Sequence, residues 1–289
     1  MKSTKKIIAI DKLHAFENHP YKVQDNEEME ALAESIKEHG IVSPVIVRPL
    51  ENTIDEYEII SGHRRVMASR KAGITEVPAL IVSLDRDAAA IVLVDSNLHR
   101  EHILPSEKAF AYKMKADAMA HQGWRSDLTS GQFVPKSDDN RTTAQIGADT
   151  GDSYKTVQRY IRLTNLIPEI LNYVDEGRIS FTPAVELSYL NEQEQHDLLE
   201  QIEQSDCTPS LSQACRFKKI SQGEGLTPEV IAEIMEEEKA NQREMFKVPM
   251  ERIRQYIPNA NAKQAEDFVL KACEHYRKFL IRQRNRDER

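Results

Sequence analysis

Two adjacent arginines, Arg64 and Arg65, follow a turn of small residues at the start of a helical pattern. They lie in the segment IISGHRRVMASRKAG (59–73), where Ser61 and Gly62 separate an apolar, strand-like run from the helix. A helix start presents unpaired backbone N–H groups and the positive end of a dipole, which attract an anion. Guanidinium groups grip phosphate through paired hydrogen bonds, and glycine permits close backbone approach. The segment is therefore a candidate phosphate site. The alternative is a solvated helix end with one surface ion pair.

Polar residues that could complete this site come from flanking segments. Arg48 belongs to a predicted strand before the turn, and Asn97 and Arg100 end a predicted helix after it. His63 stands between the glycine and the arginines. It is either an inert histidine at a helix start or a ligand or base.

A second segment, TTAQIGADTGDSYKTVQRYIRLTNL (142–166), predicts a helix-turn-helix. Gly147 is expected on the inner face of the first helix, and Gly151 takes the turn. Small residues suit this motif because its two helices cross closely. Val157 and Tyr160 lie where the second helix must pack against the first.

The second helix of this motif carries two opposite stripes. The stripe expected to pack inward consists of Tyr154, Val157, Ile161 and Thr164. The other stripe has amide and guanidinium groups for base edges and cations for phosphates. Residues 141–165 hold four basic and two acidic residues, although the whole chain has a net charge of −8. The expected DNA contacts are Ser153, Lys155, Thr156, Gln158, Arg159 and Arg162. The alternative is a solvated basic face in an ordinary helical bundle.

The first hundred residues alternate strand and helix signals, which predicts an α+β unit around the candidate phosphate site. A capping box of Asp25 and Glu28 should open a helix that Gly40 closes. The segments 44–49 and 57–61 should pair as an antiparallel hairpin. Further predicted elements are strands over 6–11 and 77–82 and helices over 63–72 and 85–100.

Helical patterns dominate after residue 101, with a polar segment at 123–141 that predicts an inserted loop. A break at 221–229 is the candidate linker, so the predicted domains are 1–103, 104–222 and 223–289. The last segment, 262–289, should form one helix with an apolar stripe and an arginine-rich end. That helix either pairs with a second copy or packs on its own chain.

Composition limits the classes of protein to which the chain can belong. No stretch of eighteen apolar residues occurs, which predicts neither a membrane span nor a signal peptide, and we expect a cytoplasmic protein. The three cysteines lack short metal-ligand spacing and should be ordinary thiols.

Three blocks of the sequence resemble the ParB family of DNA-partition proteins in their order and spacing. They are LAESIKEHGIVSPVIVRP, YEIISGHRRVMASRKAGITEVPALIV and DSNLHREHILPSEKAFAYKMK, and with the helix-turn-helix they cover residues 7 to about 200. The resemblance implies an α+β ParB/sulfiredoxin-like domain that binds CTP with Mg2+. It further implies an all-α helix-turn-helix domain behind it and a helical C-terminal tail.

The resemblance also implies which residues bind the nucleotide. The matching positions are Gly40, Pro44, Gly62, His63, Arg64, Arg65, Asn97 and Arg100, with Asn97 as the metal ligand. Where the family usually has two glutamates associated with metal handling and hydrolysis, this chain has His63 and Ser96. Hard cations favour carboxylate oxygens. We therefore expect at most a weak CTPase and assign no catalytic residue.

The function implied by the resemblance is partition of a plasmid, chromosome or mobile element. We expect a homodimer that loads at a specific site on double-stranded DNA and closes when CTP binds. It would associate with the nucleoid or a plasmid and work with a ParA-type ATPase, without a membrane partner. The alternatives are a helix-turn-helix regulator of transcription or replication with a vestigial pocket, and a ParB-fold nucleotide-dependent kinase or phosphatase.

Overall fold

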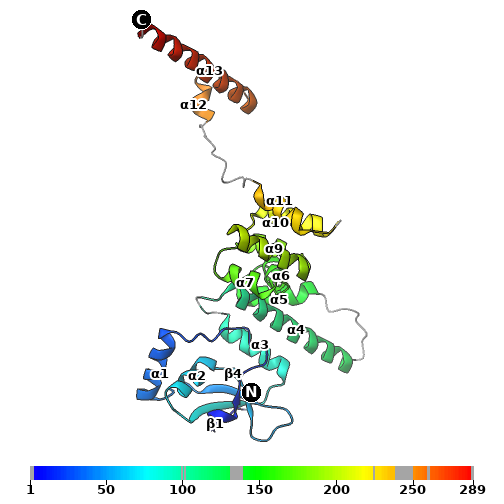
Figure 1. Cartoon of the computed structure of the whole chain (residues 1–289). Coiled ribbons are helices and arrows are strands. Elements are labelled where there is room, and N and C mark those ends of the chain that lie inside the picture. The colour runs from blue at the N-terminus through cyan, green and yellow to red at the C-terminus, as the bar shows by residue number, and fades with distance from the viewer. Residues whose placement is uncertain are drawn as a thin grey trace. The chain divides into compact units, whose positions relative to one another are not determined.

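The chain divides into two compact units, residues 1–237 and residues 238–289. Within them, the computed structural model describes residues 3–98, 100, 102–130, 139–223, 225–237, 250–258 and 261–287 (Figure 1). None of the helices in these ranges is long and apolar enough to cross a membrane. All three cysteines are free thiols.

A five-stranded mixed sheet begins the first unit, with the strand order β1-β5-β3-β4-β2 (Figure 1). Its strands are β1 (Ser3–Ala9), β2 (Leu13–His14), β3 (Val45–Pro49), β4 (Tyr57–Ser61) and β5 (Glu76–Val82). The pairing of β3 with β4 is antiparallel, which confirms the predicted hairpin. β5 pairs parallel to β3 and antiparallel to β1, while β2 lies parallel to β4. The segment between β1 and β2 is a short 3-10 helix, η1 (Ile10–Lys12).

Three helices join this sheet: α1 (Glu27–His39), α2 (His63–Lys71) and α3 (Arg86–Asn97). The predicted capping box at the start of α1 is wrong. Asn26 is the N-cap, because its side chain accepts a hydrogen bond from the Met29 amide at 3.2 Å. Asp25 instead pairs with Lys71 of α2. The side chains of Asn and Asp cap helices about equally well, so the sequence left both positions open.

A bundle of helices completes the first unit. Its members are α4 (Pro105–Ser130), α5 (Asp139–Thr150), α6 (Tyr154–Leu163), α7 (Pro168–Asp175), α8 (Phe181–Leu187), α9 (Glu192–Ser205), α10 (Leu211–Ser221) and α11 (Pro228–Glu236). Helix occupies both ends of the predicted loop 123–141, and its residues 131–138 lie outside the described residues. Helix α11 buries Ile231 and Ile234 in the core of the bundle, so the two units divide later than the predicted start of a C-terminal region at 223.

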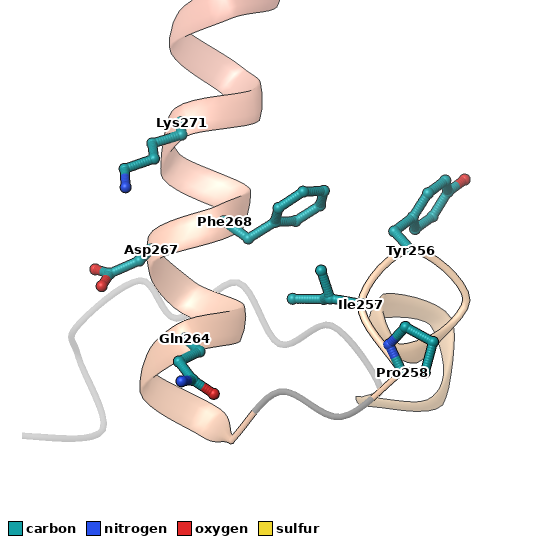
Figure 2. Close-up of a pocket in the computed structure, with 7 residues that line it drawn as sticks. All are labelled: Tyr256, Ile257, Pro258, Gln264, Asp267, Phe268 and Lys271. Carbon is teal, nitrogen blue, oxygen red and sulfur yellow. The ribbon is translucent and has the colours of Figure 1, made fainter.

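The second unit contains α12 (Met250–Arg254) and α13 (Ala262–Asp287). Figure 2 shows Phe268 of α13 pointing toward Ile257 and Tyr256, across a hollow between α13 and the turn that follows α12. Ala265 of α13 is buried, whereas large apolar side chains further along the helix are exposed. They are Leu270, Tyr276, Phe279, Leu280 and Ile281. The predicted fold class is confirmed: an α+β domain, a helix-turn-helix domain and a helical C-terminal region.

Candidate functional site

The start of α2 is held against β3 by a glycine. Gly62 has a φ of +107°, and a Cβ there would lie 2.8 Å from Cγ1 of Val45. A left-handed backbone and this contact both demand glycine. Since no side chain caps α2, the first amides of the helix remain available to a ligand.

A cavity of about 140 Å³ lies in front of these amides. It brings together six of the eight residues predicted to bind nucleotide: Gly62, His63, Arg64, Arg65, Asn97 and Arg100. The other two, Gly40 and Pro44, do not line it. Gly40 ends α1 with a φ of +71°. Pro44 is linked to the cavity through its carbonyl oxygen, which accepts a hydrogen bond from Arg65 at 3.0 Å.

The two neighbouring arginines of α2 have different surroundings. Arg64 extends to a surface ion pair with Glu28 at 3.0 Å, in which both side chains are exposed. Exposed pairs of this kind contribute about 0–1 kcal/mol, so an anion can displace Glu28. Arg65 donates to the carbonyls of Ser43 and Pro44 and is half-buried. Arg65 therefore ties α2 to the segment before β3, while Arg64 is the more available cation.

Two histidines form one wall of the cavity. The rings of His19 and His63 lie 3.9 Å apart between centroids, and Nε2 of His63 faces the Phe16 amide at 3.4 Å. Burial, with smaller contributions from His19 and Arg100, lowers the pKa of His63 to about 3. Burial also lowers the pKa of His19, whose Nδ1 donates to the Tyr21 carbonyl at 2.7 Å. Both rings are therefore neutral at physiological pH. They add no positive charge to a cavity that is already lined by Lys22, Arg64, Arg65 and Arg100.

The fit of a magnesium ion to this cavity is poor. Mg2+ in proteins usually takes one or two carboxylates together with substrate phosphates. No Asp or Glu occurs among the described residues that line the cavity, and no group of three His, Cys, Asp or Glu in the described chain could hold a metal. Asn97 is buried, and its Nδ2 donates to the Leu93 carbonyl at 2.7 Å, which leaves its amide oxygen as a single neutral ligand. The role of Asn97 as a metal ligand stays a prediction.

Sequence reasoning missed four residues that line the cavity and included three that do not. His19, Tyr21, Lys22 and Val23 line it from the segment between β2 and α1, which carries no motif. Gly40 and Pro44 lie outside it, and so does Arg48. Its Nε donates to Glu58 at 2.6 Å across the β3–β4 hairpin, and both side chains are about 95% buried. The alternation of strand residues could have indicated this pairing, since Arg48 and Glu58 are cross-strand neighbours.

The predicted helix-turn-helix is formed by α5 and α6. A Cβ on Gly147 would lie 2.5 Å from the Asp152 carbonyl oxygen, and Gly151 has a φ of +77°. Ile146 and Val157 are fully buried and pack with Tyr112 of α4. The close crossing and the left-handed turn therefore depend on glycine, as the sequence predicted.

The outer face of α6 presents some of the predicted DNA contacts and not others. Lys155 is exposed, and Ser153 caps the helix by accepting a hydrogen bond from the Thr156 amide at 3.1 Å. Arg159 donates to Thr182 at 3.0 Å, and Arg162 lies over the Tyr189 ring at 3.7 Å. These two arginines thus lie on the bundle itself in this structure.

The inner stripe of α6 differs from prediction at one end. Tyr154 is 44% exposed, so it does not pack inward, whereas Leu163 is fully buried. Tyr154 is the first residue of the helix, and its backbone amide lies next to Gly147 of α5 while its side chain is exposed. Gln158 is exposed on the outer face, and it also has an interaction partner elsewhere in the same chain.

Comparison with known families agrees with this arrangement. The family model for the ParB N-terminal domain matches residues 1–98. The family model for the ParB HTH domain matches residues 137–210. The first match contains the sheet and every residue that lines the cavity except Arg100, and the second contains α5 and α6.

Individual relatives match the same regions. The chain is 30% identical over 202 residues to the probable plasmid-partitioning protein ParB of Deinococcus radiodurans, covering 68% of each chain. It is 35% identical over 166 residues to the probable chromosome 1-partitioning protein ParB of that organism, covering 57% of this chain and 49% of the relative. The chain therefore spans about half the length of the latter relative.

Among the solved structures that match is a crystal structure of the C-terminally truncated chromosome-partitioning protein ParB from Caulobacter crescentus complexed with CTP-gamma-S. The identity is 25%, the match covers 69% of this chain and 98% of that chain, and the TM-score is 0.32.

Proposed function

Because this chain belongs to the ParB family of DNA-partition proteins, we propose that it binds a specific DNA site and is switched by CTP in the cavity at the start of α2. The observation that carries the nucleotide part is the composition of the cavity. Lys22, Arg64, Arg65 and Arg100 contribute cations from three separate segments, and the first residues of α2 line the same space. This combination suits the charge of a triphosphate.

The size of the cavity supports binding of one part of the nucleotide inside it and the rest outside. Pockets that enclose a whole drug-sized molecule have volumes of roughly 300–1,000 Å³. At about 140 Å³, this cavity accommodates the phosphates. The base and ribose then lie outside it, so the phosphate charge provides most of the affinity.

The histidine that replaces a family glutamate does not favour hydrolysis. A general base works best when its pKa is near the working pH. Because burial lowers the pKa of His63 to about 3, its ring is a weak base at neutral pH. We therefore propose that CTP acts as a ligand for switching and that hydrolysis is slow or absent.

The DNA part of the proposal rests on the outer face of α6. Lys155, Thr156 and Gln158 would enter a major groove, and Ser153 at the amino end of the helix would lie next to a phosphate. Arg159 and Arg162 would first have to leave Thr182 and Tyr189. Their contacts with bases or phosphates are thus expected only in the DNA complex.

The apolar surface of α13 supports assembly into a homodimer. Tyr276, Phe279 and Leu280 are 46–61% exposed on one helix. Contiguous exposed apolar residues mark interaction surfaces, and helix-turn-helix proteins commonly read paired half-sites as dimers. A Tyr276→Glu/Leu280→Glu protein should sediment as a monomer, while a Lys271→Glu control stays dimeric. A wild-type chain that sediments as a monomer would contradict the proposed dimer.

The central experiment measures CTP binding and DNA occupancy in the same protein. Wild type should bind CTP, and the DNA recovered with it from cells should extend for kilobases around one site. An Arg64→Ala protein should keep the site and lose the extension. Recovery of a single short site with both proteins would favour a local regulator with a vestigial pocket, and steady phosphate release would favour an enzyme. A ParA-type ATPase as partner and nucleoid or plasmid association belong to the same proposal.

A further inference from the structure

Lys22 stands at the rim of the cavity and is already paired with the helix-turn-helix domain. Its ammonium lies 3.1 Å from Oδ2 of Asp175, the last residue of α7. The Asp175 side chain is only 8% exposed, whereas that of Lys22 is 50% exposed. The pair therefore joins a cavity residue to a largely buried carboxylate in the next domain.

Asp175 does not depend on Lys22 for its hydrogen bonds. It also accepts from the amide of Ser106 at 2.9 Å and from the hydroxyl of Ser106 at 2.5 Å. These two bonds fix the carboxylate at the start of α4. If the ammonium left, Asp175 would keep two donors and would not be an unpaired buried charge.

A hydrogen bond fixes the backbone of Lys22, whereas its side chain is half exposed. Its amide donates to Oε1 of Glu107 at 2.8 Å, and Oε2 of the same carboxylate accepts from the Leu104 amide at 3.1 Å. The backbone end of the Lys22 side chain is thus fixed beside the cavity. Its flexible four-carbon stem allows the ammonium to face either Asp175 or a phosphate in the cavity.

We propose that the ammonium of Lys22 is exchanged between Asp175 and the nucleotide phosphates, so that CTP binding releases a contact between the nucleotide and helix-turn-helix domains. This inference rests on the proposed function, because it needs phosphates in the cavity. The triphosphate carries more negative charge than one carboxylate, the ammonium itself is half exposed, and Asp175 keeps its two donors from Ser106 when the ammonium leaves. By thermodynamic reciprocity, any state that strengthens the Lys22–Asp175 pair weakens CTP binding.

The test is the affinity of the full chain for CTP and for inorganic triphosphate. Lys22→Ala should weaken binding of both about tenfold, because a charge-assisted contact is lost. Asp175→Asn should strengthen binding of both about threefold, because the Asp175 carboxylate no longer competes for the ammonium. In the Lys22→Ala background, Asp175→Asn should have no effect. Asp206→Asn is the matched control: it removes one charge from an exposed pair with Arg178, and affinity should be unchanged.

The sign of the Asp175→Asn effect separates exchange from other roles. Loss of positioning or of folding would weaken binding, whereas competition strengthens it. Unchanged or weaker binding by Asp175→Asn, or unchanged binding by Lys22→Ala, would overturn the exchange while leaving the proposed function intact. A wild-type chain that binds neither ligand would overturn both proposals.

Discussion

Two pairs of arginines, one beside the cavity and one on the outer face of α6, look alike in sequence and differ in the structure. Among the described residues, Arg64 pairs with the exposed carboxylate of Glu28, and Arg65 donates to two backbone carbonyls. On α6, Arg159 contacts Thr182 and the Phe181 ring, and Arg162 lies over Tyr189. A cation held by an exposed partner is available to an anion, and one held by backbone or an aromatic ring stabilises its own domain first.

The cavity and α6 therefore prepare for their ligands in different ways. At the cavity the amides of α2, Arg64 and Arg100 are in place before a nucleotide arrives. On α6 the two arginines must give up internal contacts, so part of the binding energy is offset by their rearrangement. Substitutions within each pair can show whether this distinction holds.

The largest effect is expected at the glycine that presses α2 onto β3. Gly62→Ala should lower the free energy of unfolding by about 3 kcal/mol, since overpacking against Val45 adds to the cost of a left-handed alanine. Gly73→Ala is the matched control. Its φ of +74° is also positive but open space surrounds it, so about 1 kcal/mol is expected. Urea denaturation measures both, and equal losses would mean that the contact with Val45 is unimportant.

The next largest effect is a difference in stability between Arg65→Ala and Arg64→Ala. Arg65→Ala should lower the free energy of unfolding by about 2 kcal/mol, because two carbonyls lose a charged donor. Arg64→Ala should leave stability within about 0.5 kcal/mol and weaken CTP binding at least about tenfold. Denaturation and calorimetric titration on the same two proteins provide the comparison. The reverse assignment, with Arg64 stabilising the fold, would contradict the distinction drawn here.

A smaller effect is expected on α6. Arg162→Ala should cost about 1 kcal/mol of stability, because a close cation–π contact is lost. The loss is limited, since Nε of Arg162 is buried without a hydrogen-bond partner among the described residues. Lys155→Ala should leave stability unchanged and reduce the salt dependence of DNA binding by about one unit of slope. Equal stability of the two variants would show that Arg162 is as available as Lys155.

The smallest effect at neutral pH concerns the histidine wall. Burial lowers the pKa of His63 below its usual 6.5 to about 3, so the unfolded chain binds a proton at a higher pH than the folded one. The free energy of unfolding should therefore be unaffected by His63 above about pH 7 and fall as the pH drops from about 6.5 toward 3. His63→Gln should make this fall shallower without removing it, because burial also lowers the pKa of His19. Parallel pH profiles for the two proteins would show that His63 is not buried in solution.

Much of the architecture follows from local rules. The β3–β4 hairpin was predictable from two β-branched runs separated by a polar loop, and the start of α2 from a glycine at the end of a strand. The crossing of α5 and α6 followed from Gly147 and Gly151. In each case neighbouring residues supply the determining contacts, so their types and spacing contain the information.

The partners of individual charged side chains did not follow from such rules. Arg48 faces Glu58 across two strands, Lys22 faces Asp175 from another domain, and His19 stacks on His63. Each of these pairs joins segments that only folding brings together. A long side chain can also reach several acceptors at similar distances, so its partner does not follow from the sequence. The amino-acid order specified which elements form and where a phosphate could bind. Packing settled which cations remain free to bind it, because burial and nearby acceptors determine the energy of each charge.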